Sequence, residues 1–578
     1  MDSAAPVIVE HANNNGYKYS SKKRGGWNAA IFIIFVEIAD RFAYYGMYGN
    51  LFVYLTSVLH ESDPTAAKNI NLWVGVSSLF PIIGALIADS FFGRFRTIVA
   101  SSLIYVLGTV LLSLSVSVIP MDARKPIFFV ALYILSVGEG GHKPCVQTFA
   151  ADQFDDDSKE EREAKASFFN WWYLGIVFGA TAAIFLVTYV QDNIGWAVGF
   201  WMLTAVAAAA FGMFLVGFKR YRKEPPVGSP ITSVVQVLVA AARKWRVNET
   251  RSCMGIYYGE DDMTVGEVVK GQPGGAHILA RTNQFRFLDK AAIIDNHDAS
   301  TETRNPWRLC SQNQVEEVKL VLRLIPIWLS CLMFNVVQAQ LHTYFIKQSS
   351  TMVRNLGPHF VLPPAILQGF VGFAILIAIP IYDKVFVPLI RKFTKHPAGI
   401  TVLQRIGVGL FLSIINMVVS ALVEVKRVNV AKKHNLLDNT KTIVPMKVWW
   451  LFPQFILCGV SDAFTVVGLQ ELYYEQMPVN MRSLGAAAYI SITGVGNFLS
   501  SGVIALVQDI SPKYGQAWLG NNFNRSHLDK FYWLLAALSV VSLVVYVWIA
   551  KCFVYKKIEG QETAKNYSSS YLQDGGQA

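Results

Sequence analysis

The sequence predicts an all-α membrane protein in which twelve transmembrane helices form two six-helix bundles. Hydrophobic residues make up 53% of the 578 residues and charged residues only 16%, whereas soluble proteins carry about 25% charged residues. The apolar residues gather in runs close to the ~20 residues that one helical span needs. A polar, basic segment separates these runs into two sets of six. This division predicts two bundles joined by a linker.

The spans follow one another in a regular order. The first set covers residues 27–59, 72–92, 98–119, 126–149, 168–190 and 195–218. The second set covers residues 318–345, 363–390, 399–423, 448–472, 483–507 and 531–553. We therefore expect an N-terminal arm (1–26), an N-terminal bundle (27–218), a linker (219–317), a C-terminal bundle (318–553) and a tail (554–578).

Basic residues predict how the chain is oriented. They are concentrated in the arm, after the second, fourth and eighth spans, in the linker and in the tail, and the positive-inside rule makes these segments cytosolic. The arm lacks the short apolar core of a cleaved signal, so we expect the first span to direct insertion. The loop between spans nine and ten is an exception, because on the opposite side it would hold Lys426, Arg427, Lys432 and Lys433.

Two further patterns concern modification of the chain. A sequon begins at Asn524 in a loop on the side opposite the linker, and it is a candidate for glycosylation. Thr97 follows Arg94 and Arg96, a pattern that fits a basic-directed kinase site. The other interpretation of Thr97 is an N-cap of the third span. A kinase is thus a candidate partner of the chain.

Several function classes are disfavoured by composition. The net charge of +11 is spread over short loops between apolar runs, which argues against nucleic-acid binding. The six cysteines have no CxxC spacing, so neither a disulfide framework nor a zinc site is indicated. No nucleophile elbow or phosphate loop appears, which makes an enzyme a weak interpretation. We expect no cofactor.

The first span carries Glu37, Asp40 and Arg41 within five residues. Each ionised group facing lipid at bilayer depth costs roughly 2.5–3.5 kcal/mol, so these side chains are expected to face protein or a water-filled cavity. On a helix Glu37 and Arg41 are one turn apart, and Asp40 lies beside both. The carboxylates can pair with the guanidinium or take up protons, as a proton-coupled transport site requires. The alternative interpretation is that these residues form an ion network with a purely structural role.

Two other spans carry ionisable groups. The fourth has Glu139, His142 and Lys143 in a glycine-rich stretch, and the tenth has Asp462. Glu139 and Lys143 are an i, i+4 pair, so Glu139 can simply neutralise Lys143. Lys143 can alternatively snorkel to the cytosolic surface, and His142 is more often a satisfied core histidine than a proton carrier. Acids and bases that must choose partners can exchange them as protons arrive.

Several motifs resemble the plant branch of the proton-coupled peptide and nitrate transporter family, within the major facilitator superfamily. The family's Glu-x-x-Glu-Arg, followed by Phe-x-Tyr-Tyr-Gly, is similar to residues 37–46, where Asp40 replaces the second glutamate. Further similar stretches lie at residues 84–96, 141–154, 168–173, 382–388 and 399–407. The resemblance runs from about Trp27 to Phe553, and the combination of motifs is very specific.

The resemblance implies a proton-coupled carrier working by alternating access. It assigns proton coupling to Glu37, Asp40, Arg41, Lys143 and Asp462, and it makes Lys143 and Asp462 a candidate gate between the bundles. Peptide-carrying relatives hold a glutamate in the seventh helix, which this chain replaces within Gln338-Ala-Gln340. One nitrate-carrying type has a histidine where Gln338 lies. His342, one turn later, is a candidate substitute.

The expected substrate site lies between the bundles and includes Arg41, Tyr44, Tyr45, Lys143, Asn335 and Gln338. Nitrate is the leading substrate, because Arg41 and Lys143 offer positive charge and the peptide-type glutamate is absent. A small organic acid, hormone conjugate, glycoside or small peptide is the alternative, and a non-transporting nutrient sensor on the same fold is another. The membrane is either the plasma membrane or the vacuolar membrane.

Overall fold

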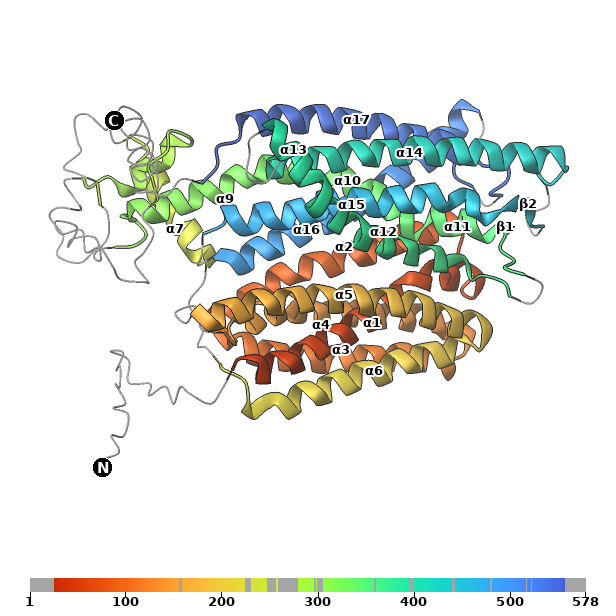
Figure 1. Cartoon of the computed structure of the whole chain (residues 1–578), viewed down its shortest axis with the longest axis horizontal. Helices are drawn as coiled ribbons and strands as arrows, with labels where there is room; N and C mark the ends of the chain where they lie inside the picture. The colour runs from red at the N-terminus through yellow and green to blue at the C-terminus, as the bar shows by residue number, and fades with distance from the viewer. Residues whose placement is uncertain are drawn as a thin grey trace.

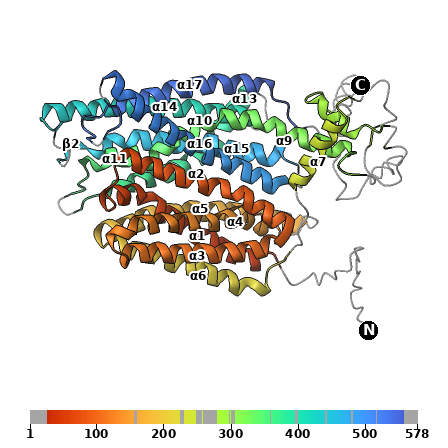
Figure 2. The same cartoon turned by 180° about the vertical axis from the view of Figure 1, so that it is seen from behind.

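The computed structural model describes residues 25–154, 159–223, 230–246, 256–257, 279–295, 298, 305–357, 360–394, 400–438, 442–478, 481–515, 517–520 and 522–556. Two groups of long helices lie side by side along the long axis of the molecule (Figure 1) and keep this arrangement when seen from behind (Figure 2). We call the end with α7 the linker end and the end with β1 and β2 the far end.

The N-terminal bundle contains six long helices, which alternate in direction. They are α1 (Trp27–Ser57), α2 (Asp63–Ile87), α3 (Arg94–Ser117), α4 (Met121–Ala151), α5 (Lys159–Asn193) and α6 (Trp196–Val216). A π-helical turn, η1 (Ala88–Phe92), extends α2, and a short 3-10 helix, η2 (Gly217–Lys219), extends α6. α3 packs on α4, and α1 packs on α5 and α6.

The C-terminal bundle has more broken helices. Its seventh span comprises α9 (Gln312–Ser330), α10 (Leu332–Gln338), η4 (Ala339–His342) and α11 (Tyr344–Ser350). Its eighth comprises η5 (Pro364–Gln368), α12 (Gly369–Ile381), η6 (Tyr382–Phe386) and α13 (Val387–Thr394). The others are α14 (Val402–Lys433), α15 (Phe452–Gln476), α16 (Arg482–Ile510) and α17 (Leu528–Cys552). A short 3-10 helix, η7 (Val448–Leu451), precedes α15, and another, η9 (Ser511–Tyr514), follows α16. Two short strands, β1 (Met352–Val353) and β2 (Val444–Lys447), pair in parallel.

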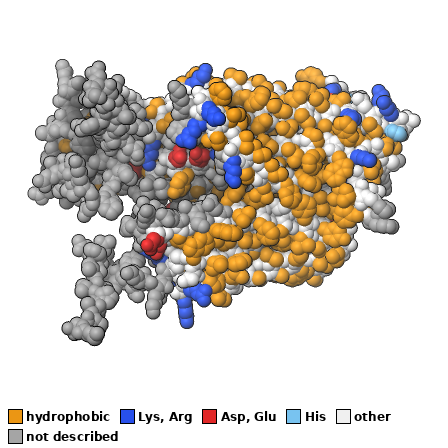
Figure 3. Space-filling view, viewed as in Figure 1, with side chains coloured by type: hydrophobic (Ala, Val, Ile, Leu, Met, Phe, Trp, Pro, Cys, Tyr) orange, Lys and Arg blue, Asp and Glu red, His pale blue; other side chains and the backbone are white. Residues whose placement is uncertain are grey.

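The predicted fold class is confirmed. In the described part of the chain nine helices are long and apolar enough to cross a membrane, and the seventh span, bent by 42°, is a tenth. The remaining two, α1 and α4, lie alongside them and are the helices with the clustered charges (Figure 1). Hydrophobic side chains cover the middle of the molecule, and Lys and Arg gather toward its ends (Figure 3). Such a belt is what a bilayer-spanning surface requires.

The linker is partly folded against the seventh span. α7 (Pro230–Arg243) and η3 (Arg286–Ala292) pack on the start of α9, where Val237, Leu288 and Val315 share an apolar core. α9 begins six residues before the predicted boundary at 318, because Ser311 and Gln314 form a reciprocal capping box. The buried Lys319 pairs with Asp289 of η3 and with Glu316 at 2.7 Å.

The four basic residues expected in the loop between spans nine and ten lie in a helix instead. α14 continues to Lys433, ten residues beyond the predicted end at 423, so Arg427 lies inside the helix and is fully buried. Its guanidinium donates to Glu424 at 2.7 and 2.9 Å and to the side-chain oxygen of Asn524 at 2.7 Å. Because Glu424 neutralises Arg427, this charge does not contradict the predicted orientation.

The expectation of glycosylation at Asn524 is wrong for the folded chain. Asn524 is only 4% exposed, and its side-chain nitrogen donates to the carbonyl of Leu436 at 3.1 Å. A glycan is attached through that same nitrogen. The packing around Asn524 therefore leaves no place for it.

Candidate functional site

The charged residues of α1 form one buried cluster. Arg41 Nε donates to Glu37 Oε1 at 2.7 Å, as their one-turn spacing predicts, and Arg41 Nη2 lies 3.9 Å from Asp40 Oδ2. Both carboxylates are buried, whereas the Arg41 side chain keeps 16% of its surface exposed. The cation is therefore the accessible member of the group.

α4 completes this cluster from the neighbouring side. Lys143 Nζ donates to Glu139 at 2.9 Å and lies 3.9 Å from the centre of the Tyr44 ring. His142 Nδ1 lies 3.6 Å from Asp40 Oδ1, so α4 and α1 bring their titratable groups together. We call Glu37, Asp40, Arg41, Glu139, His142 and Lys143 the N-bundle cluster.

Glu139 and His142 were absent from the proton-coupling residues expected from the sequence. Their spacing from Lys143 was visible, but only the tertiary structure places His142 against Asp40. Asp40 Oδ2 and Glu139 Oε1 are buried and accept no hydrogen bond from a described residue. Buried carboxylate oxygens with spare acceptor capacity are sites where a proton can be taken up.

Glycines allow α4 to approach its neighbours at this point. A Cβ at Gly84 of α2 would lie 2.1 Å from the carbonyl oxygen of Gly140, and a Cβ at Gly141 would lie 2.8 Å from Ser101 Cβ of α3. These distances are shorter than packed side chains permit. The glycines that flank Glu139 thus bring the charged face of α4 against the bundle.

The C-terminal bundle contributes a second polar group. Gln338, at the end of α10, donates from Nε2 to Asp462 Oδ1 of α15 at 2.5 Å, and the Cys458 thiol donates to Gln338 Oε1. Asn335, one turn earlier, lies against α16. A Cβ added at Gly496 of α16 would be 2.4 Å from the Cβ of Asn335. Gln338 and Asp462 are thus brought together, whereas Asn335 packs against a different helix.

The expected pairing of Lys143 with Asp462 is not made in this conformation. Each residue has a partner within its own bundle, Glu139 for Lys143 and Gln338 for Asp462. Tyr45 of α1 and Tyr173 of α5 nevertheless lie within range of the Asp462 carboxylate, so Asp462 faces the other bundle. The two polar groups therefore face each other across the interface between the bundles.

At the far end the two bundles are in direct contact. Asp63 of α2 forms an ion pair with Lys347 of α11 at 2.9 Å. Three hydrogen bonds also cross the interface, from Asn71 to Ser500 (3.0 Å), from Gln368 to the carbonyl of Gly49 (2.8 Å) and from Ser501 to the carbonyl of Lys68 (3.1 Å). α2 packs along α16 in the same region. The structure is closed at the far end.

Two other predicted residues lie away from the central site. His342 is half-buried at the far-end contact, with its ring centre 3.9 Å from that of Tyr48, so here it does not take the place of Gln338. Thr97 lies in the first turn of α3 rather than at its N-cap, which is Gly93. Its hydroxyl donates to the Gly93 carbonyl at 3.0 Å and is buried, so a kinase cannot reach it in this conformation.

Comparison with known protein families matches residues 95–519 to the POT family. The chain belongs to this family. The Arabidopsis thaliana protein NRT1/PTR family 5.4 is 54% identical over 543 residues, which cover 94% of this chain and 97% of the relative. NRT1/PTR family 5.10 from the same plant is 44% identical over 571 residues, covering 96% and 97%.

Solved structures support the fold of this POT-family chain. An auto-inhibited POT family peptide transporter matches with a TM-score of 0.69 at 21% identity, covering 92% of this chain and 98% of that one. A POT family transporter in complex with 5-aminolevulinic acid matches with a TM-score of 0.62 at 13% identity, covering 91% and 96%. The protein is a multi-pass integral membrane transporter of a proton-dependent family, and it is not an enzyme.

Proposed function

We propose that this protein is a secondary transporter that couples proton flow to the movement of a small anion, with nitrate as the first candidate. The observation that carries the proposal is the N-bundle cluster, in which buried carboxylates lie beside two cations. Arg41 and Lys143 keep 16% and 11% of their side chains exposed. Intramembrane ionisable groups of this kind are usually functional.

The positive-inside rule assigns the linker end to the cytosol, so the far end is the outer side. The closed far end then corresponds to an inward-facing state of an alternating-access cycle. In this state an anion from the cytosolic side meets Arg41 and Lys143, with Tyr44, Tyr45 and Gln338 beside them. Asp40 and Glu139 keep oxygens that can take up protons.

Proton uptake changes the partner of Lys143. When Glu139 is protonated, its ion pair with Lys143 loses its charge attraction. Among the described residues Asp462 accepts its hydrogen bond from a neutral amide, that of Gln338. Asp462 is therefore a charged group in the facing wall with which Lys143 can pair. Formation of that pair would draw the bundles together on the cytosolic side, and protonation of Asp462 would release it.

The energetics favour more than one proton for each anion. Moving one elementary charge against 100 mV costs about 2.3 kcal/mol, so a monovalent anion that enters a negative cytosol needs at least two protons for net charge to flow inward. Asp40 and Glu139 could provide this number. Aromatic faces at Tyr44 and Tyr45 favour a carboxylate-bearing organic metabolite as the second candidate substrate.

The test is tracer uptake and current in oocytes at pH 5.5 and 7.5, for nitrate and a panel of organic anions. Asp40→Asn should reach the surface normally and lose the increase in uptake on acidification. Asp509→Asn, which removes an exposed carboxylate, is the matched control. Uptake by Asp40→Asn that equals the unmutated protein at both pH values would reject the coupling role. Substrate binding to purified vesicles without flux would instead indicate a sensor.

A further inference from the structure

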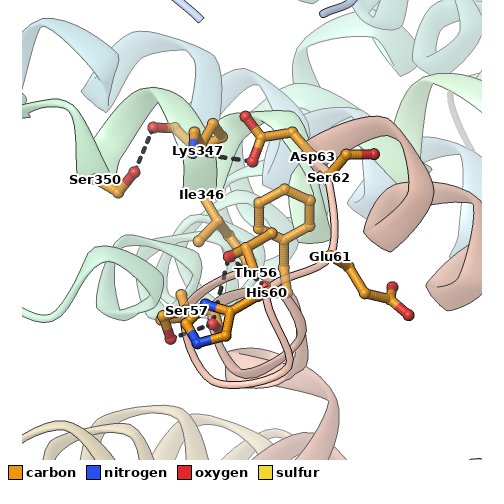
Figure 4. Close-up of a pocket in the computed structure, with 11 residues that line it drawn as sticks. Thr56, Ser57, His60, Glu61, Ser62, Asp63, Ile346, Lys347 and Ser350 are labelled. Atoms are coloured by element: carbon orange, nitrogen blue, oxygen red, sulfur yellow. Dashed lines mark hydrogen bonds and ion pairs between the residues drawn. The ribbon is translucent and has the colours of Figure 1, made fainter. Parts of the chain in front are cut away.

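A cavity of about 490 Å³ lies at the far end, on the cross-bundle ion pair (Figure 4). The end of α1, the connection to α2 and the helix α11 surround it, so both bundles contribute to its wall. Its polar lining residues are Thr56, Ser57, His60, Glu61, Ser62, Asp63, Lys347 and Ser350. Figure 4 shows Lys347 and Asp63 joined on one side of the cavity, with His60 and Thr56 opposite them.

Most of the polar lining is already satisfied. Glu61 is buried, accepts two hydrogen bonds from Asn69 at 2.9 and 3.1 Å and pairs with Lys125 at 2.8 Å. The hydroxyls of Thr56 and Ser350 donate to carbonyls of their own helices at 2.9 and 2.8 Å. These groups shape the cavity but have little capacity left for a ligand. The ion pair between Asp63 and Lys347 is different.

Lys347 and Asp63 each retain bonding capacity. The Lys347 ammonium has three N–H groups, of which the ion pair with Asp63 Oδ1 needs one, and 24% of its side chain is exposed. The Asp63 side chain is only 6% exposed, and its Oδ2 accepts no hydrogen bond from a described residue. A proton on Asp63 would leave Lys347 as a partly exposed cation without its counterion, next to a cavity large enough for a small solute.

We propose that this cavity is an outer binding site for a small anion, in which Lys347 binds the anion after Asp63 has taken up a proton. The inference rests on the proposed function, proton-coupled anion transport. It adds a second anion site, separate from the N-bundle cluster. The charges balance, because the proton neutralises Asp63 and the anion replaces its charge beside Lys347. The same exchange removes the ion pair that joins α2 to α11 at the closed end.

The groups that face Asp63 are consistent with this exchange. Lys347 and Tyr344 approach it from α11, and His60 and Glu61 precede it in the connection from α1. Lys125 of α4 holds Glu61, so that carboxylate does not compete for Lys347. Asp63 is therefore the counterion that an incoming anion must replace.

A simple structural latch and an anion site make different predictions. Asp63→Asn and Lys347→Gln both break the ion pair, so a latch alone predicts that both change transport in the same direction. The anion site predicts opposite changes in KM for the external anion. Asp63→Asn should lower KM by about three- to tenfold and flatten its pH dependence, while Lys347→Gln should raise KM by a similar factor.

The matched controls are Asp509→Asn and Lys513→Gln. These two residues form an exposed ion pair at 2.8 Å near the end of α16, outside the cavity. Neither substitution should change KM. Equal and parallel effects of Asp63→Asn and Lys347→Gln would overturn the proposal, even if uptake in the unmutated protein is driven by protons.

A second readout does not depend on transport. Ser350→Cys places a thiol in the cavity wall, which can react from outside with membrane-impermeant anionic and cationic thiosulfonate reagents. The ratio of the reaction rate with the anionic reagent to that with the cationic reagent should rise when the pH is lowered from 7.5 to 5.5. The same ratio should fall in the Lys347→Gln background and when nitrate is added. A ratio that is unchanged by Lys347→Gln would reject the site. The expected ratios without any uptake would reject the proposed function and keep the site.

Discussion

Because Arg427 is buried in an ion pair, replacing it should lower the stability of the folded protein. The substitution Arg427→Met leaves Glu424 in the core without its cation. Among the described residues, Gln348 is then its remaining hydrogen-bond donor, at 2.7 Å. Both side chains of the ion pair have no exposed surface. Breaking a buried pair by removing one partner costs about 3–5 kcal/mol. For a unit the size of the C-terminal bundle this corresponds to a fall of roughly 6–20 °C in Tm.

The assay is thermal unfolding of purified, detergent-solubilised protein, followed by the monodisperse fraction after heating. Lys426→Met is the matched control. Lys426 is the neighbouring residue on α14, and its exposed ammonium lies 3.0 Å from the centre of the Trp450 ring. An exposed contact of this kind contributes about 0.5–1 kcal/mol, so the control should lose at most a few degrees.

A double variant separates the two contributions. Glu424→Gln combined with Arg427→Met removes both charges, and it should recover much of the loss because no unpaired charge stays buried. If Arg427→Met melts within a few degrees of the unmutated protein, Arg427 does not lie in the core as described. If the double variant is no more stable than Arg427→Met, burial of the unpaired carboxylate is not the cause of the loss.

Two further predictions concern packing and reactivity. Gly84→Ala should lower both the yield of folded protein and transport, because the added Cβ would lie 2.1 Å from the Gly140 carbonyl oxygen beside Glu139; unchanged yield and uptake would contradict the close approach of α2 to α4. Burial raises the pKa of the Cys310 thiol to about 11, so at pH 8 it should stay protonated and resist alkylation, whereas the exposed Cys552 should react. Peptide mapping after brief maleimide treatment at pH 8 and at pH 10 checks this, and equal labelling of both cysteines at pH 8 would refute it.

The sequence alone predicted the fold class, and it predicted that the charged residues of α1 do not face lipid. Apolar runs of membrane-spanning length show where helices must lie, because a bilayer leaves the backbone no other way to satisfy its hydrogen bonds. Three charges within one such run must be buried in protein or face water, whatever the neighbouring helices are. One-turn spacing also predicts the pairs of Glu37 with Arg41 and of Glu139 with Lys143.

Contacts between distant segments were decided only by the tertiary structure. The sequence places Arg427 in a loop, whereas in the structure α14 continues past it and Glu424 neutralises its charge. Helical spacing says nothing about which residue of another helix lies opposite, so neither the approach of His142 to Asp40 nor the pairing of Asp63 with Lys347 could be predicted. The first contact depends on how α1 and α4 pack within one bundle, and the second depends on how the two bundles dock. Both are determined by the packing of whole helix faces rather than by any local pattern.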